Sequence, residues 1–125
     1  MSLKIWDINN LKLELDMENA DVQERYESAF NQMSEEEKQI KKDGKMSEFT
    51  RSYCGLFTRL FDRIFGEETS EKIFSGIPVS ISKYLEIYDS FLDFVKQQTE
   101  AITADTVKRL SKYKPNRQQR RAKKK

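Results

Sequence analysis

The chain has 125 residues, a net charge of +2, 37% apolar residues and 35% charged residues, which fits one domain with a modest core. It contains one cysteine and no histidine, so an internal disulfide, His-metal sites and Ser-His or Cys-His catalysis are excluded. No apolar run reaches the ~18 residues that span a bilayer, and the first residues lack the apolar stretch of a secretory signal. We therefore expect a cytoplasmic protein that does not enter a membrane.

The first expected element is a β-hairpin over residues 3–16. Apolar and polar residues alternate strictly from Leu11 to Asp16, as in a strand with one buried face. Asn9 and Asn10 precede this run, and asparagine tolerates the positive φ that a two-residue hairpin turn requires. An isolated hairpin is marginally stable in water, so we expect it to pack on a helix or to pair with another chain.

The first long helix is expected over residues 20–43. Asp21 and Glu24 have the spacing of a capping box, and Gly44 is a plausible stop. The charged segment 34–43 predicts an exposed end for this helix. Apolar residues recur at helical spacing within it, namely Val22, Tyr26, Ala29, Phe30, Met33 and Ile40.

The widest apolar stripe predicts a core helix over residues 47–65, with Ser47 as its N-cap. Cys54 lies within this stripe, and no neighbouring residue lowers the pKa of its thiol, so we expect a buried structural cysteine. A short helix over residues 69–75 follows, capped by Thr69 or Ser70.

The last expected helix, residues 80–113, begins with Ser80 as N-cap and ends before Pro115, with a candidate break at Thr103–Asp105. Its apolar stripe continues to Leu110, beyond what the shorter helices could cover. We therefore expect part of the stripe to be exposed and to contact a partner, either another copy or a different protein. The residues expected to make this contact are Tyr84, Tyr88, Phe91 and Val95.

Charge is divided unevenly along the chain. From Lys108 onward there are ten basic residues and no acidic one, whereas the preceding 107 residues carry 21 acidic and 13 basic residues. Residues 114–125 have no apolar face, and we expect them to be disordered when free. The patterns together predict a mainly α protein: a small helical bundle over residues 1–113 with a short N-terminal β-hairpin, followed by a flexible basic tail.

The basic tail has three interpretations. It could neutralise nucleic-acid phosphates, although it lacks aromatic residues for base stacking. It could dock on an acidic protein surface, including that of another copy, or it could simply aid solubility. We favour protein contact and solubility over nucleic acid. The tail residues expected to make contact are Arg117, Arg120 and Arg121.

No pattern in the sequence indicates an enzyme. The four glycines do not fall into a dinucleotide- or phosphate-binding spacing. The acidic run Glu35–Glu37 and the pair Asp89 and Asp93 are typical of solvated helix surfaces. We therefore expect no metal, no cofactor and no catalytic residue.

Four segments in order carry a family resemblance: the strand at 11–16, LFDRIFGEET at 60–69, KIFSG at 72–76 and KYKPNRQQRR at 112–121. Together they resemble small proteins encoded by phages and prophages of Gram-positive bacteria, similar to the tail assembly chaperones of long-tailed phages. The resemblance implies binding to tail-tube subunits and to the tape-measure protein, which such chaperones keep soluble until the tube polymerises around it. It brings no catalytic residues.

Two other functions remain open from the sequence. One is a small nucleic-acid-binding regulator that uses the basic tail, and the other is a structural tail or head-completion protein. The former predicts salt-sensitive duplex binding that is lost without the tail. The latter predicts that the protein stays in purified virions, from which a chaperone is absent.

Overall fold

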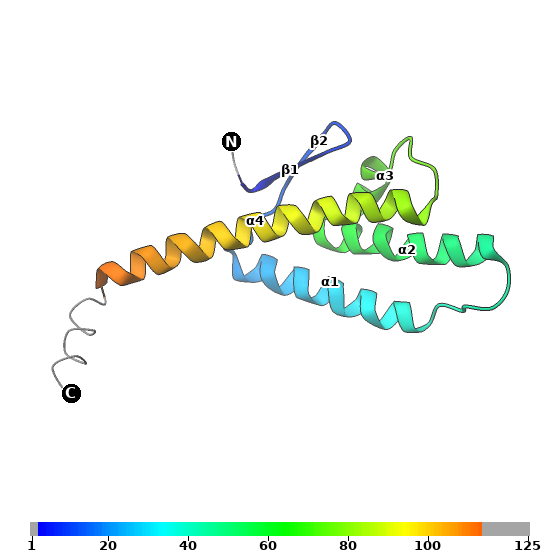
Figure 1. The fold of residues 1–125 in the computed structure, drawn as a ribbon, viewed down its shortest axis with the longest axis horizontal. Coiled ribbons are helices and arrows are strands. Elements are labelled where there is room, and N and C mark those ends of the chain that lie inside the picture. Colours follow the sequence, from blue (N-terminus) through cyan, green and yellow to red (C-terminus); the bar gives the residue numbers. More distant parts are fainter. Residues whose placement is uncertain (1–2, 114–125) are drawn as a thin grey trace.

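The computed structural model describes residues 3–113 of the chain. It is mainly helical with a short N-terminal hairpin, as the sequence predicts (Figure 1). The expectation of a disordered tail at 114–125 lies outside the described residues. The elements in chain order are β1 (Ile5–Ile8), β2 (Leu11–Glu14), α1 (Ala20–Lys38), α2 (Met46–Phe65), α3 (Thr69–Ile73) and α4 (Ile81–Tyr113).

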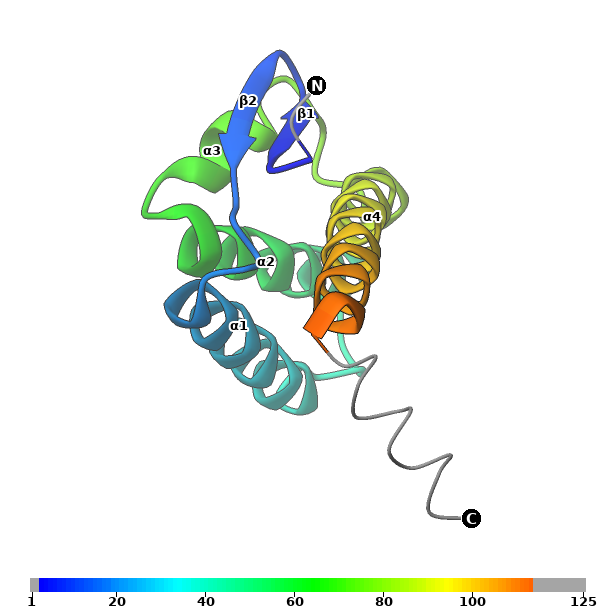
Figure 2. The same ribbon diagram turned by 90° about the vertical axis from the view of Figure 1, so that its left-hand side faces the viewer.

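The helices are arranged around α2. In the end-on view of Figure 2, α2 lies between α1 below and the hairpin with α3 above, and α4 runs along one side. Figure 1 shows that the C-terminal part of α4 extends past the other helices. The expectation that this helix projects beyond the body is therefore confirmed.

The predicted asparagine turn is confirmed. Asn9 and Asn10 have φ of 48° and 63°, and the antiparallel register pairs Ile8 with Leu11 across a two-residue turn. The Asn9 side chain also donates hydrogen bonds to the carbonyls of Ile73 at 3.1 Å and Ser75 at 2.9 Å, at the end of α3. The turn thus fixes the hairpin to the bundle.

Trp6 anchors the hairpin in the core. Its indole is 3% exposed and lies 5.5 Å from the ring of Phe61 and 5.2 Å from that of Phe91. Its Nε1 donates to the Ser90 hydroxyl at 3.1 Å, so the polar atom of this buried ring has a partner. The hairpin therefore packs on helices of its own chain, which is one of the two arrangements that we expected.

Gln98 ties the residues before and after the hairpin to α4. Its side chain is 2% exposed, and its Oε1 accepts a hydrogen bond from the backbone N–H of Met17 at 2.6 Å. Its Nε2 donates to the carbonyls of Leu3 and Leu15, each at 2.9 Å. A buried amide is tolerated here because its donor and acceptor atoms both have partners.

The end of α1 differs from the prediction. The helix stops at Lys38 instead of residue 43, with Gln39 as C-cap. The last bonds tighten to i→i−3 spacing, from Gln39 N–H to Glu36 and from Ile40 N–H to Glu37. Ile40 is half-buried and lines the same pocket as Phe49 of α2. Asn19, not Asp21, caps the N-terminus by accepting from the N–H groups of Asp21 and Val22.

Three further details correct the sequence prediction. Lys45, not Ser47, is the N-cap of α2, and it makes no side-chain cap. The short helix α3 ends at Ile73, two residues before the predicted end, and Asp62 of α2 caps it by accepting from the N–H and the hydroxyl of Ser70. The predicted break at Thr103–Asp105 is absent, because α4 is continuous from Ile81 to Tyr113.

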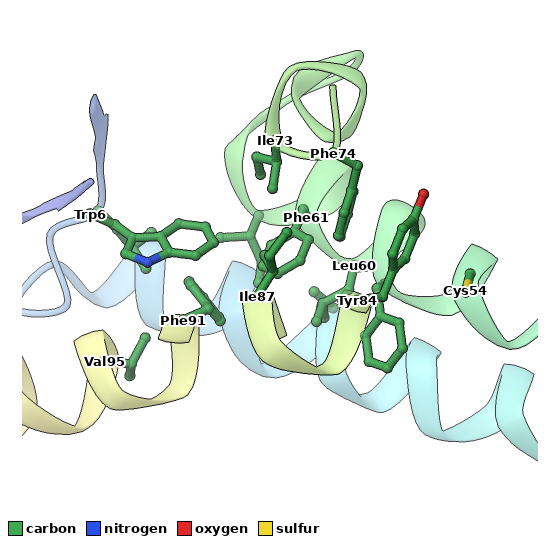
Figure 3. Packing of buried hydrophobic residues seen from close by; sticks show 14 of the residues in the cluster. Trp6, Cys54, Leu60, Phe61, Ile73, Phe74, Tyr84, Ile87, Phe91 and Val95 are labelled. Carbon is green, nitrogen blue, oxygen red and sulfur yellow. The ribbon is translucent and has the colours of Figure 1, made fainter. Parts of the chain in front are cut away.

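The core lies where α2, α4, α3 and the hairpin meet, as Figure 3 shows. Phe61 and Phe91 are 0% exposed, with ring centroids 5.3 Å apart in an edge-to-face arrangement. Cys54 is buried, as predicted, and burial raises the pKa of its thiol, so it stays protonated and unreactive.

Candidate partner-binding surface

The structure places most of the predicted contact residues of α4 inside the core. Tyr84, Phe91 and Val95 are 5%, 0% and 7% exposed, and all three point inward in Figure 3. The expectation that they are exposed is wrong, because the hairpin and α3 cover the side of α4 that α2 leaves open. Of the four, Tyr88 alone is half-buried. Arg117, Arg120 and Arg121 lie outside the described residues.

Tyr88 belongs to a line of half-buried aromatic rings that crosses three helices, which we call the aromatic seam. Its members are Phe49 and Tyr53 of α2, Tyr88 of α4, and Phe30 and Tyr26 of α1. The buried ring of Phe57 lies behind the seam, 5.6 Å from Tyr53 and 5.0 Å from Tyr88. Helical periodicity places Tyr26, Phe30 and Tyr88 on apolar stripes, but it does not predict that they lie together at the surface.

The rings of the seam contact one another in two groups. Phe49 lies 5.8 Å from Tyr53, while Phe30 lies 6.3 Å from Tyr88 and 4.6 Å from Tyr26. These are ordinary packing distances for aromatic pairs. The buried ring of Phe57 joins the two groups, so the seam brings together residues that are far apart in the sequence.

The apolar stripe of α1 packs at the margin of the core, and polar contacts hold the flank of this helix on α2. Arg25 donates to the carbonyl of Ile64 at 2.9 Å, and Glu36 accepts from Arg63 at 3.1 Å. Ala29 is the one fully buried residue of α1. The apolar stripe of this helix is otherwise half-buried and comprises Val22, Tyr26, Phe30 and Met33.

Two hydroxyl groups of the seam, those of Tyr88 and Tyr26, have a raised pKa. Burial raises the pKa of Tyr88, and Tyr53, Asp89 and Glu37 act in the same direction. Burial and the neighbouring Tyr88 raise the pKa of Tyr26. Asp89 and Glu37 are themselves exposed, so the seam has acidic side chains beside Tyr88.

An open pocket continues the seam at the end of the α1–α2 pair. Phe49, Tyr53 and Ile40 supply its apolar lining, and Ser34, Glu37, Lys38 and Lys42 supply polar and charged atoms. The three apolar residues can contact an apolar side chain, and the charged residues can pair with polar groups beside it. The surface is suited to an amphipathic protein segment.

A second exposed apolar feature lies at the far end of α4. Every side chain from Thr103 to Lys112 is exposed, and we call these residues the α4 end. Val107 is 60% exposed and Leu110 is 46% exposed. The charged residues on the same turns, from Thr106 onward, are all basic: Lys108, Arg109 and Lys112.

Within residues 3–113, no cluster of Cys, Asp or Glu side chains is suited to hold a metal ion. Among the same residues, no helix combines the length and the apolar character needed to cross a membrane.

Comparison with known proteins gives a family without an assigned activity. Residues 9–124 match the model of a family of unknown function, DUF6673. Neither a curated protein nor a solved structure matches the chain.

Proposed function

We propose that this chain, which belongs to the DUF6673 family of unknown function, is a non-catalytic assembly chaperone that binds a helical segment of a phage tail protein. The aromatic seam is the observation that carries the proposal. The seam includes the half-buried apolar stripe of α1. This helix is 19 residues long, and Ala29 is its one fully buried residue. We assign the tape-measure protein as the client, with the tail-tube protein as the second candidate within the same assembly.

The chemistry of the seam fits a long helical client. A tape-measure helix presents an apolar stripe, and such a stripe docks on a complementary apolar surface through side chains spaced one turn apart. Tyrosine rings provide contact area with few rotatable bonds, and their hydroxyls hydrogen-bond to the polar edge of a helix. A contact of this limited size favours reversible binding, which a chaperone needs when tube subunits replace it.

The sequence supplies the second line of support. The segments at 60–69 and 112–121 resemble those of tail assembly chaperones, and residues 9–124 match the model of a single family. The family match therefore covers most of the chain, including both of these segments.

The test is co-purification with the tape-measure and tail-tube proteins of the same phage or prophage. The tagged full-length chain is co-expressed with each candidate, treated with nuclease and washed at moderate and high salt. We expect the tape-measure protein to be retained by the wild type and lost by Phe30→Glu, which places a charge in the seam. Tyr53→Glu tests the same surface from α2.

The matched control is Val79→Asp, which places a charge on an exposed apolar residue outside the seam. Circular dichroism checks that each variant is folded. Recovery of nucleic acid alone, lost with nuclease or at high salt, would replace the chaperone proposal by the regulator. Stable retention of the protein in purified virions would replace it by the structural tail or head-completion protein.

A further inference from the structure

The α4 end presents its apolar residues to the side that faces away from its own body. Gln98 faces the body, because its amide binds backbone groups of the hairpin region. Val107 follows nine residues later, which is about 2.5 turns of helix, so it points to the opposite side. Leu110 is one turn further on, next to Val107.

The aromatic seam and the α4 end are complementary in polarity. Beside Tyr88 and Phe30 the charged neighbours of the seam are the exposed carboxylates of Glu37 and Asp89, whereas Lys38 and Lys42 line the pocket at its Phe49 end. The α4 end carries an apolar pair and, from Thr106 to Lys112, three basic residues and no acidic one. Arg109 is held at 3.0 Å by Asp105, which leaves Lys108 and Lys112 as the charges most available to a partner. Opposite charges at the edges of two apolar surfaces favour their approach.

The same molecule cannot bring these two surfaces together. α4 is one uninterrupted helix, and Figure 1 shows that its C-terminal part leads away from the other helices. Tyr88 lies 19 residues before Val107 on this helix, which separates them by about 28 Å along the axis. If an α4 end contacts a seam, the two surfaces must therefore belong to different copies of the protein.

We propose that the α4 end of one copy docks on the aromatic seam of a second copy, and that the exchange is reciprocal. Val107 and Leu110 of each copy then cover the half-buried rings of Tyr88 and Phe30 of the other. Reciprocal exchange gives a closed dimer with a two-fold axis and two equal contacts. In the chain without a client, the α4 end of the other copy covers the seam. A client helix, as in the proposed function, would have to displace that α4 end.

The first experiment measures the mass of the full-length protein by light scattering and sedimentation over a range of concentrations. We expect a dimer with twice the 14.8 kDa mass of the chain. The double variant Val107→Asp with Leu110→Asp should weaken dimerisation at least about tenfold. Both residues are exposed, so the variant should fold as the wild type does. Val79→Asp is the matched control and should remain dimeric.

The second experiment tests the pairing of donor and acceptor. The Val107→Asp/Leu110→Asp variant keeps an intact seam, and the Phe30→Glu variant keeps an intact α4 end. Each should be monomeric alone, whereas their mixture should form heterodimers through the one intact contact. Tyr53→Glu replaces Phe30→Glu if the latter does not fold.

A wild-type protein that is monomeric at all concentrations would overturn the inference. A dimer that is unaffected by the double variant, or a mixture that forms no heterodimer, would do so as well. These outcomes are separate from the client test, because the Val107→Asp/Leu110→Asp variant should still retain the tape-measure protein through its intact seam. Failure of self-association therefore leaves the chaperone proposal intact.

Discussion

The two ends of α4 share one helix but differ in what covers them. Between Ile81 and Gln98 the helix buries a side chain about once every turn against the rest of the protein, whereas from Thr103 to Lys112 all its side chains are exposed. The apolar residues continue through both parts, but Val107 lies on the opposite side of the helix from Gln98. Helical periodicity therefore predicts the helix, while burial depends on which neighbours reach each side.

Among substitutions in α4, we expect the largest loss of stability at Phe91. Replacing Phe91 by Ala removes a 0%-exposed ring that contacts Trp6 and Phe61, and should lower the free energy of unfolding by about 3–5 kcal/mol. Urea denaturation followed by circular dichroism measures this change. A loss below about 1 kcal/mol would contradict the described core.

Gln98 marks the boundary between the two parts, and its loss should have the next largest effect. Gln98→Met keeps the volume but leaves the buried N–H of Met17 and the carbonyl of Leu15 without partners, at a cost of about 2–4 kcal/mol. Urea denaturation measures the cost, and amide exchange of Met17 should become faster in the variant. Unchanged exchange at Met17 would show that Gln98 does not hold the strands.

Helix α1 buries few side chains, and ionic contacts of Glu36 help to hold it on α2. A hydrogen bond from Arg63 lowers the pKa of Glu36 below its ordinary value of 4.5, and Arg59 acts in the same direction. Because the folded-state pKa is lowered, this stabilisation is present above pH 4.5 and is lost as the pH falls through the lower folded value.

Glu36→Gln should therefore cost about 1 kcal/mol at neutral pH. The cost should shrink below pH 4.5. Denaturation of wild type and variant at several pH values measures the difference. A difference that does not change with pH would assign the contact to packing instead of charge.

The smallest effect is expected at the α4 end. Val107→Ala and Leu110→Ala should each change the free energy of unfolding by no more than about 0.5 kcal/mol in dilute solution, because both side chains are exposed. Comparison with Phe91→Ala under the same conditions tests the contrast between the two parts of α4 directly. A large loss at Leu110 would show that its side chain packs on the body.

Local sequence patterns predicted the hairpin turn at Asn9 and Asn10, the order of the helices and the burial of Cys54. Each of these depends on residues close in the sequence. The cap that Asp62 provides for α3 was missed, because it depends on how the chain turns back after Gly66. The end of α1 at Lys38 was missed as well, because Gly44 was the first stop signal that the sequence offered.

The candidate surface was harder to predict than the fold. Periodicity identified Tyr84, Tyr88 and Phe91 as apolar positions of one helix, but their exposure depends on the hairpin and α3, which cover the stripe unevenly. Gln98 did leave a signal in the sequence. It lies three residues after Val95 and four before Ile102, so a polar side chain interrupts the core-facing stripe at a position where only a hydrogen-bonded amide is tolerated.

The bond between Gln98 and Met17 also has a consequence for synthesis on the ribosome. These residues are 81 positions apart, and translation at about 5–20 residues per second separates them by about 4–16 s. Throughout that interval the residues around the nascent hairpin lack the amide of Gln98, and until Ser90 is synthesised Trp6 also lacks its hydroxyl partner. A polypeptide interrupted before α4 is synthesised therefore carries a hairpin without these two anchors.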